Sequence, residues 1–356
     1  MSEPRAKAEL IEDRGAAAVS DDFFRSRPFL DAERVTHTLR IVTPDGAELL
    51  APLIVREIPP STGGNVDSEA TSRPTGQQFD AISPYGYPGL VDSTAEGGGG
   101  SHPGLAPASA RTSSRYAGTN ASELDPATID FSATGLVSVF LRHRLGRPPL
   151  SGASERNVVQ IADPGLPPKS RPSDRRQVRK NLEAGYALTL APGPEATPEQ
   201  RAGFLGVYEQ TMRRTDAAQH YFFGGAYFDR VLEADGTWLA LATAPGGELA
   251  AASLAAASDG YLHYYLSGSA DSHLRDSPMK NIVARLIEHS AELGLPLNLG
   301  GGISAGDALE EFKRGFANRS EPWQTSEIVC DTEKYELLRA GHAGGDFFPA
   351  YRAQED

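Results

Sequence analysis

An amphipathic helix is predicted where apolar residues begin to recur at helical spacing after Thr197. Thr197 and Gln200 have the spacing of a capping box, with a proline between them at the first helical position. Phe204, Tyr208 and Met212 then repeat every four residues, which places them on one face. The pattern therefore predicts a helix that begins after Thr197 and packs through this apolar face.

Three strand-like runs follow at 237–244, 249–257 and 261–269, and short turns rich in Gly, Pro and Asp separate them. This spacing predicts an antiparallel meander. Apolar residues at helical spacing after Pro278 predict a further helix that ends near Gly294. The run "LPLNL" then predicts a short buried strand that leads into three consecutive glycines.

The first half of the chain repeats part of this sequence pattern. Residues 39–57 and 239–257 share a strand, a Pro-x-Gly turn, a Glu-Leu pair and a second strand. This internal repeat favours two similarly built domains, which we assign to 1–155 and 156–325, with a tail at 326–356. Two segments of the first domain, 59–78 and 91–114, are rich in Gly, Ser, Pro and Thr and are predicted to be mobile loops.

Composition and charge narrow the class of protein. The chain has 356 residues and 39% hydrophobic content, enough for large cores, and no apolar run approaches the ~20 residues of a membrane span. The N-terminus is charged and does not resemble a signal peptide, so the expected compartment is the cytoplasm. A net charge of −13 argues against a protein that coats DNA. One segment, 169–180, is nevertheless basic, and it is either a solvated stretch or a phosphate contact.

Common catalytic motifs are weak in this sequence. "GISAG" matches a nucleophile elbow at Ser304, but only about 50 residues remain after it for an acid, His342 and the rest of a hydrolase sheet. No histidine has a metal-ligand spacing, so neither a metal nor a bound cofactor is expected. His263 is interpreted as a strand residue that faces a pocket or solvent.

The helix predicted after the glycines has an ordinary interpretation from its spacing. Asp307 and Glu310 are predicted to form a capping box, and Leu309, Phe312 and Phe316 to form a buried stripe. By spacing alone, the lysine at position 313 would be a solvated helix residue.

The order of meander, helix and strand is that of the acyltransferases that use acetyl-CoA. In that superfamily the donor pyrophosphate binds to backbone amides at the N-terminus of the central helix, in a loop that needs glycine. The corresponding segment here, 269–280, has no glycine. A donor pyrophosphate held in that way is therefore not expected.

Several motifs together resemble the FemABX-like aminoacyltransferases over about residues 30–340. They are "SPYGYPG" (83–89), "FLRHRL" (140–145), "RKNLEAG" (179–185), "YEQTMRRTDAAQHYFF" (208–223), "HYYLSGS" (263–269) and "LGGG" with "D-x-L-x-x-FK-x-x-F" (299–316). The resemblance implies an α/β (α+β) fold of two tandem acetyltransferase-like (GNAT) domains, with mixed, mostly antiparallel sheets flanked by helices. It also implies that the tail packs on the first domain.

The resemblance implies transfer of an amino acid from aminoacyl-tRNA to an amine. Lys313 would stabilise the tetrahedral oxyanion, and the backbone carbonyl of Phe312 would orient the attacking amine. The acceptor would be a small metabolite, a natural-product intermediate or a peptide. An acyl-CoA-dependent N-acyltransferase and a non-catalytic binding protein of the same fold stay open as alternatives.

Further residues are predicted to contact substrates. Phosphate contacts are expected from Arg175, Arg176, Arg179 and Lys180. The acceptor pocket is expected to include Tyr85, Tyr87, Arg142 and His143. Other substrate contacts are expected from His263, Tyr265, Gly300, Gly301 and Gly302, because side-chain-free backbone can approach a ligand closely.

Overall fold

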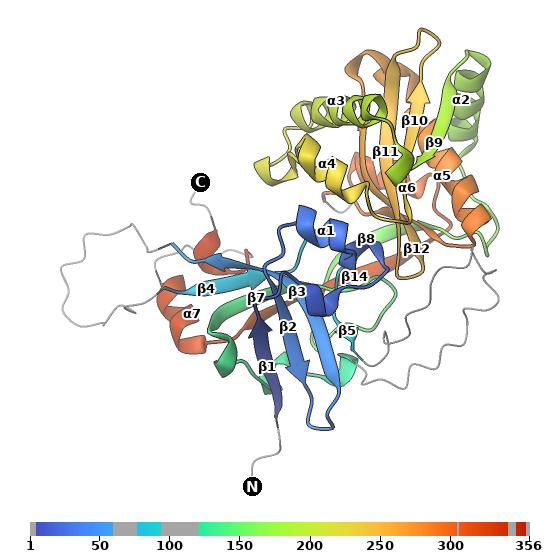
Figure 1. Cartoon of the computed structure of the whole chain (residues 1–356). Coiled ribbons are helices and arrows are strands. Elements are labelled where there is room, and N and C mark those ends of the chain that lie inside the picture. The colour runs from blue at the N-terminus through green and yellow to red at the C-terminus, as the bar shows by residue number, and fades with distance from the viewer. Residues whose placement is uncertain (1–4, 60–76, 94–120, 305, 341–346, 354–356) are drawn as a thin grey trace.

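A single mixed sheet runs through the whole molecule, as Figure 1 shows. The computed structural model describes residues 5–59, 77–93, 121–304, 306–340 and 347–353. The 14 strands follow the order β6-β1-β2-β3-β4-β7-β14-β8-β13-β12-β11-β10-β9, with β5 paired to β3. Most neighbouring pairs are antiparallel, and helices flank the sheet, so the predicted fold class is confirmed.

Strands of the first half form one end of this sheet. They are β1 (Ala6–Ile11), β2 (His37–Val42), β3 (Glu48–Glu57), β4 (Phe79–Ile82), β5 (Val91–Asp92), β6 (Ile129–Asp130) and β7 (Leu136–Arg142). The predicted first hairpin is confirmed as β2 and β3. The prediction of a mobile loop at 91–114 is wrong for its first two residues. Val91 and Asp92 form β5, which pairs with Leu49 and Leu50, and Val91 is buried. Segments 60–76 and 94–114 of the two predicted loops lie outside the described residues.

The second half carries the predicted meander and its helices. Its elements are α2 (Pro172–Glu183), β9 (Ala187–Pro192), α3 (Pro198–Arg214), α4 (Gly225–Val231), β10 (Thr237–Thr243), β11 (Leu249–Ser258), β12 (Tyr261–Ser269), α5 (Met279–Leu293), β13 (Leu297–Gly300) and α6 (Ala308–Arg314). Strands β10, β11 and β12 pair antiparallel in sequence order. The capping box of α3 is present, with Thr197 and Gln200 each accepting a hydrogen bond from the other's backbone N–H.

Two long strands join the halves. Strand β8 (Ser154–Ala162) pairs with both β13 and β14, and β14 (Arg319–Val329) pairs with both β8 and β7. The expected domain limits at 155 and 325 thus fall inside strands that the halves share. After β14, helix α7 (Thr332–Arg339) lies against β7, and the hydroxyl groups of Tyr351 and Ser138 are 2.7 Å apart.

The pairing between β12 and β13 is short. It covers only two parallel pairs, Leu262 with Leu297 and His263 with Asn298, whereas β8 on the other side of β13 pairs with Leu297, Asn298 and Gly300. On the other side of β12, the register with β11 shifts between Leu254 and Ala255. The sheet is therefore interrupted beside the end of β13, which makes this the place where groups from its two faces can meet.

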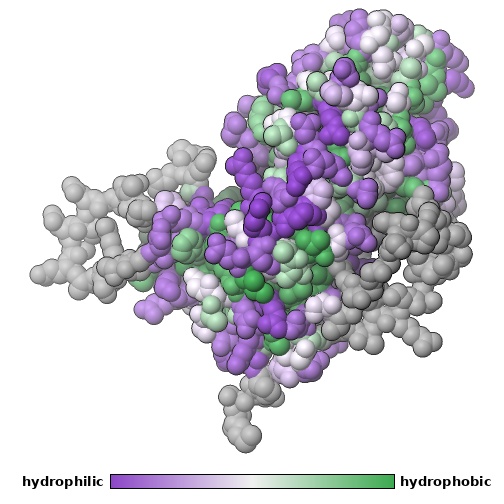
Figure 2. Space-filling view, in the orientation of Figure 1, coloured by the Kyte–Doolittle hydropathy of each residue, from purple (hydrophilic) through white to green (hydrophobic). Residues whose placement is uncertain are grey.

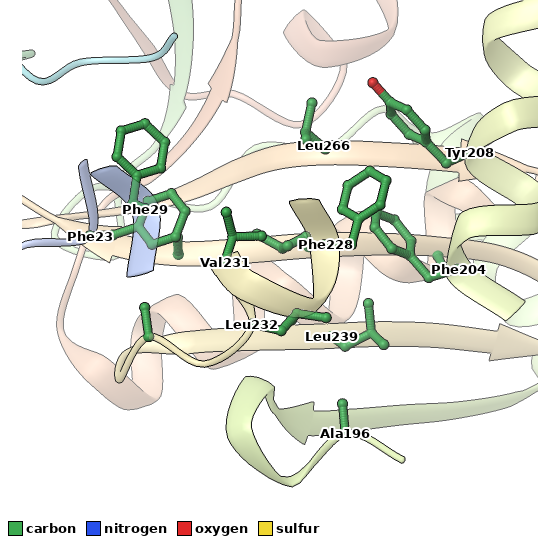
Figure 3. Packing of buried hydrophobic residues seen from close by; sticks show 14 of the residues in the cluster. Phe23, Phe29, Ala196, Phe204, Tyr208, Phe228, Val231, Leu232, Leu239 and Leu266 are labelled. Carbon is green, nitrogen blue, oxygen red and sulfur yellow. The ribbon is translucent and has the colours of Figure 1, made fainter. Parts of the chain in front are cut away.

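Two hydrophobic clusters cover opposite faces of the second half. One packs α5 against the sheet and includes Leu286 and Phe316. The other packs α3 and α4 and also takes in aromatic residues of the first half, namely Phe23, Phe24 and Phe29 around helix α1 (Arg27–Ala32). Figure 3 shows two groups of rings in this cluster, Phe23 with Phe29 and Phe204 with Phe228 and Tyr208. The aromatic seam binds the halves together through apolar contact. Outside, hydrophilic side chains dominate the face seen in Figure 2.

A buried ion network crosses the same seam. Asp259, in the turn after β11, accepts two hydrogen bonds from Arg25 at 2.9 and 3.0 Å and one from Arg144 at 2.7 Å. The Arg25 side chain is fully buried. Although burial opposes ionisation, the two guanidinium groups hold the pKa of Asp259 well below its ordinary value.

Candidate active site

Lys313 is a buried cation at the end of β13. Helix α6 begins after Asp307, whose side chain accepts a hydrogen bond from the backbone N–H of Glu310 at 2.7 Å. One and a half turns later the Lys313 ammonium donates to the carbonyl of Gly301 at 2.6 Å. Only 8% of the residue is exposed, and burial lowers its pKa to about 8, with the charge of Asp307 acting in the opposite direction. The prediction from spacing alone, that Lys313 is a solvated helix residue, is therefore wrong.

The anchoring of α6 also differs from the prediction. Leu309 is 40% exposed, so the buried stripe consists of Phe316 and the half-buried Phe312, whose rings are 5.6 Å apart. The capping box is incomplete, because Glu310 accepts from the backbone N–H of Gly306 instead of that of Asp307. The Phe312 carbonyl accepts the N–H of Gly315 at 3.1 Å.

The three glycines pack closely against their own protein neighbours. A Cβ on Gly301 would lie 2.5 Å from the amide of Asn157, and this amide donates to the Gly302 carbonyl at 2.9 Å. Gly300 has a φ of +76°, and a Cβ there would lie 3.1 Å from the Lys313 ammonium. Close packing thus accounts for glycine at these positions, and the expected approach to a ligand stays a prediction.

Asn298 connects the glycine loop to His263 and Tyr87. Its side chain accepts from the N–H of Gly300 at 2.8 Å and lies 3.0 Å from Nδ1 of His263. Nε2 of His263 lies 3.2 Å from the carbonyl of Ser258, and burial lowers the pKa of the imidazole to about 4. The histidine is therefore neutral and structural at pH 7. The centroid of the Tyr87 ring lies 5.0 Å from that of the His263 ring, and the Tyr87 side chain forms a hydrogen bond with the side chain of Asn298.

A second group of polar residues lies at the seam between the halves, where the Phe24 ring contacts both His263 and Tyr265. The carboxylate of Glu33 accepts from the backbone N–H of Tyr85 at 2.9 Å and from the Tyr227 hydroxyl at 2.8 Å. The Tyr227 hydroxyl lies 2.8 Å from that of Tyr265. Burial raises the pKa of Glu33, and attraction to Arg142 partly offsets this. The structure thus brings three predicted residues together and adds Glu33 and Tyr227.

Sequence reasoning missed these two additions because neither belongs to a motif. Glu33 is a lone acid that follows a short helix, and Tyr227 is one of several aromatic residues in its segment. His143, by contrast, is not brought into the group. It follows Arg142 directly and so points to the opposite face, where Nε2 lies 2.7 Å from the Ser326 hydroxyl.

The basic segment forms helix α2, and all four predicted phosphate-binding residues are exposed on it. Arg175 and Arg179, one turn apart, join Lys169 in lining a pocket of about 500 Å³ between α2, α5 and segment 162–170. Arg176 and Lys180 do not line it. Apolar side chains, among them Phe316, form most of the remaining wall. The pocket therefore combines apolar walls with three cationic side chains and two carboxylates, those of Asp163 and Glu288.

Helix α2 also covers the start of α5. Asn181 donates to the carbonyl of Asp276 at 2.8 Å and to the side chain of Asn281 at 2.7 Å. Lys280 forms an ion pair with Asp174 at 2.9 Å. These contacts place side chains of α2 against the segment before α5 and against the first turn of α5.

Other chemistries find little support in the described residues. Ser304 is exposed, and its N–H donates to Asp307 at 3.0 Å; the His342 of the hydrolase hypothesis lies outside the described residues. Among the residues that the structure describes, no three His, Cys, Asp or Glu side chains form a metal-binding cluster. No helix in the described ranges is long and apolar enough to cross a membrane.

Comparisons with known proteins agree with this architecture. Residues 168–314 match the family model described as an acetyltransferase (GNAT) domain. The crystal structure of FemX aligns with a TM-score of 0.57 and 13% identity, covering 92% of this chain and 99% of that chain. L-PGS from Bacillus licheniformis aligns at a TM-score of 0.41 and 12% identity over 56% of this chain and 70% of its own. No curated protein matches the sequence.

The FemX alignment covers both halves, so the predicted tandem fold and the FemABX-like resemblance are confirmed at the level of the fold. The GNAT model covers α2 through α6, the segment that holds Lys313. Residues 168–314 therefore match a GNAT acetyltransferase domain, and the chain has the fold seen in FemX.

Proposed function

We propose that the protein is an aminoacyl-tRNA-dependent aminoacyltransferase that forms an amide on the amine of a small metabolite, natural-product intermediate or peptide. The observation that carries the proposal is Lys313, a buried ammonium at the end of β13, beside the interruption of the sheet. Its sequence motif, Phe312 followed by Lys313, resembles the Phe-Lys pair of the FemABX-like enzymes. Such a donor would place the reaction in the cytoplasm.

The proposed reaction needs little beyond position and a cation. The acceptor amine attacks the ester carbonyl of the aminoacyl donor, and a C–N bond forms while the carbonyl oxygen becomes an oxyanion. The ammonium of Lys313 stabilises that charge in a site from which water is largely excluded. Collapse breaks the ester C–O bond, and the amine proton passes to the leaving ribose hydroxyl.

Phe312 can assist through its backbone. Its carbonyl oxygen accepts one hydrogen bond from Gly315, and a carbonyl has two lone pairs. The second lone pair is available to orient the N–H of the attacking amine. In this proposal Phe312 and Lys313 act from consecutive positions of α6.

A pocket that could hold either donor lies beside α2, and the packing of α2 against α5 supports tRNA over acyl-CoA as donor. The pocket beside α2 offers apolar walls for a base and Arg175 and Arg179 for phosphates. Phe316, three residues after Lys313, is part of its wall, whereas Lys313 itself does not line the pocket. The side chains of α2 occupy the start of α5, where acyl-CoA would otherwise place its pyrophosphate.

The deciding experiment consists of two parallel assays. In each, the protein is incubated with a mixture of amines; one assay contains a total charged-tRNA preparation as donor and the other a set of acyl-CoAs. Amide product that depends on charged tRNA and disappears after RNase treatment supports the proposal. Product that survives RNase refutes it. Replacing Arg175 and Arg179 by serine should raise the KM for tRNA at least tenfold, whereas the matched pair Arg176 and Lys180, outside the pocket, should have a smaller effect.

An acyl-CoA-dependent N-acyltransferase is the second candidate, because the matched family model is that of an acetyltransferase. It predicts turnover with acyl-CoA alone, without any RNA. A binding protein that has lost catalysis predicts no product from either donor, together with retained ligand affinity after Lys313→Met. The parallel assay separates all three.

A further inference from the structure

Two opposite charges face one aromatic enclosure at the seam between the halves. We define the enclosure by five side chains: Tyr85, Tyr221, Phe223, Tyr227 and Tyr265. Ring centroids of Tyr85 lie 5.8 Å from Tyr265, 6.0 Å from Tyr221 and 6.2 Å from Phe223. Tyr227 stacks on Phe223 at 4.2 Å. Glu33 is hydrogen-bonded to Tyr85 and Tyr227 of this enclosure, and Arg142 donates to the carbonyl of Ser83, two residues before Tyr85.

The protein itself does not pair these charges. Within the described ranges neither Glu33 nor Arg142 forms an ion pair, although both are half-buried. Each nevertheless shifts the pKa of the other toward the charged form. Glu33 accepts hydrogen bonds only from neutral donors, the Tyr85 N–H and the Tyr227 hydroxyl. Arg142 donates to the carbonyl of Ser83 at 2.6 Å and lies 5.2 Å from the ring of Phe140.

One short segment keeps the two charges apart. Arg142 binds Ser83, and Glu33 binds the backbone of Tyr85, two residues further along. Two residues of extended chain span at most ~7 Å. Charged side chains in such surroundings are normally paired, since desolvation is costly. A ligand that carries both charges, a few ångströms apart, would satisfy each of them.

We propose that this enclosure binds the acceptor as a free α-amino acid or a closely related zwitterion. The ammonium of the ligand lies against Glu33, its carboxylate against Arg142, and its side chain against the aromatic rings. Tyrosine faces attract an ammonium, and a guanidinium binds a carboxylate through two parallel hydrogen bonds. The inference rests on the proposed function for calling this ligand the acceptor, but its binding needs no donor.

Binding is tested first without any RNA. Thermal shift and calorimetry are run on the full chain with each of the twenty proteinogenic L-amino acids plus L-ornithine and L-2,4-diaminobutyrate. At least one should bind. The methyl ester and the N-acetyl derivative of the best ligand should each bind at least tenfold more weakly. If no member of this set binds, or if the ester binds as tightly as the free acid, the inference is wrong.

Matched variants separate recognition from folding. Glu33→Gln keeps an acceptor for the Tyr85 N–H, so the fold should persist while amino-acid affinity falls at least tenfold. The N-acetyl derivative, which has no ammonium, should lose much less affinity. Glu233→Gln, an exposed carboxylate after α4, serves as the control and should change nothing. Equal loss for both ligands in Glu33→Gln would indicate a merely structural role and overturn the inference.

The inference and the proposed function can fail separately. Amino-acid binding without tRNA-dependent transfer would leave the enclosure assigned and refute the proposed reaction. Transfer to amines that lack a carboxylate, at rates equal to those of amino acids, would support the proposed reaction and refute the zwitterion.

Discussion

Replacing Lys313 by methionine should stabilise the fold while removing activity. Burial lowers the pKa of this lysine from its ordinary 10.5 to about 8, which corresponds to about 3 kcal/mol of lost preference for the charged form. Methionine keeps much of the volume without the charge. The variant also loses the hydrogen bond to the Gly301 carbonyl, worth ~1 kcal/mol. The expected net result at pH 7 is a free energy of unfolding about 2 kcal/mol higher.

The pH dependence supplies a sign test. Between about pH 8 and 10.5 the unfolded chain holds the Lys313 proton and the folded chain has lost it. The unfolded state therefore binds more protons, and stability should rise with pH across this window in the wild type. The Lys313→Met variant should lack that rise.

Denaturant unfolding at pH 7 and pH 10, together with the transfer assay, measures both consequences. The variant should lose activity by about 10²–10³, as for the removal of an oxyanion donor. Lys334→Met, at a half-buried lysine of α7 that pairs with Asp331, is the control and should stay within ~0.5 kcal/mol with unchanged activity. A Lys313→Met protein less stable than the wild type by 2 kcal/mol would refute the reasoning and make the lysine a structural tie.

Three further predictions follow from the same contacts. The transfer rate should fall above pH about 8 as Lys313 loses its proton, and Lys313→Arg should remove that fall; a pH–rate profile of kcat checks this. Gly300→Ala should reduce activity more than Gly306→Ala, because both glycines have a φ of +76° but only the first would contact the Lys313 ammonium; matched kinetics and melting curves separate strain from displacement. Asp259→Asn should cost up to about 3–5 kcal/mol, since buried Arg25 keeps its ion pair with Asp22 but loses the carboxylate of Asp259, and urea titration measures the loss.

Local patterns in the sequence determined much of the second half. The capping box at Thr197, the three runs of the meander and the stop at Gly294 depend on neighbours a few residues away, and the structure has each of them. Because helix and strand periodicity arise from such short-range geometry, one chain segment carries enough information. The importance of Lys313 came only from the resemblance of its motif, since its spacing indicated a solvated residue.

The tertiary structure decided which side chains meet and which are buried. Leu309 fits an apolar stripe by spacing but faces solvent, while Lys313 on the same helix is covered by the glycine loop. Glu33, Arg142 and Tyr227 come from three distant segments and share a site only because the seam between the halves closes over them. Burial depends on which faces of distant segments pack together, and the spacing of apolar residues within one segment does not determine those contacts.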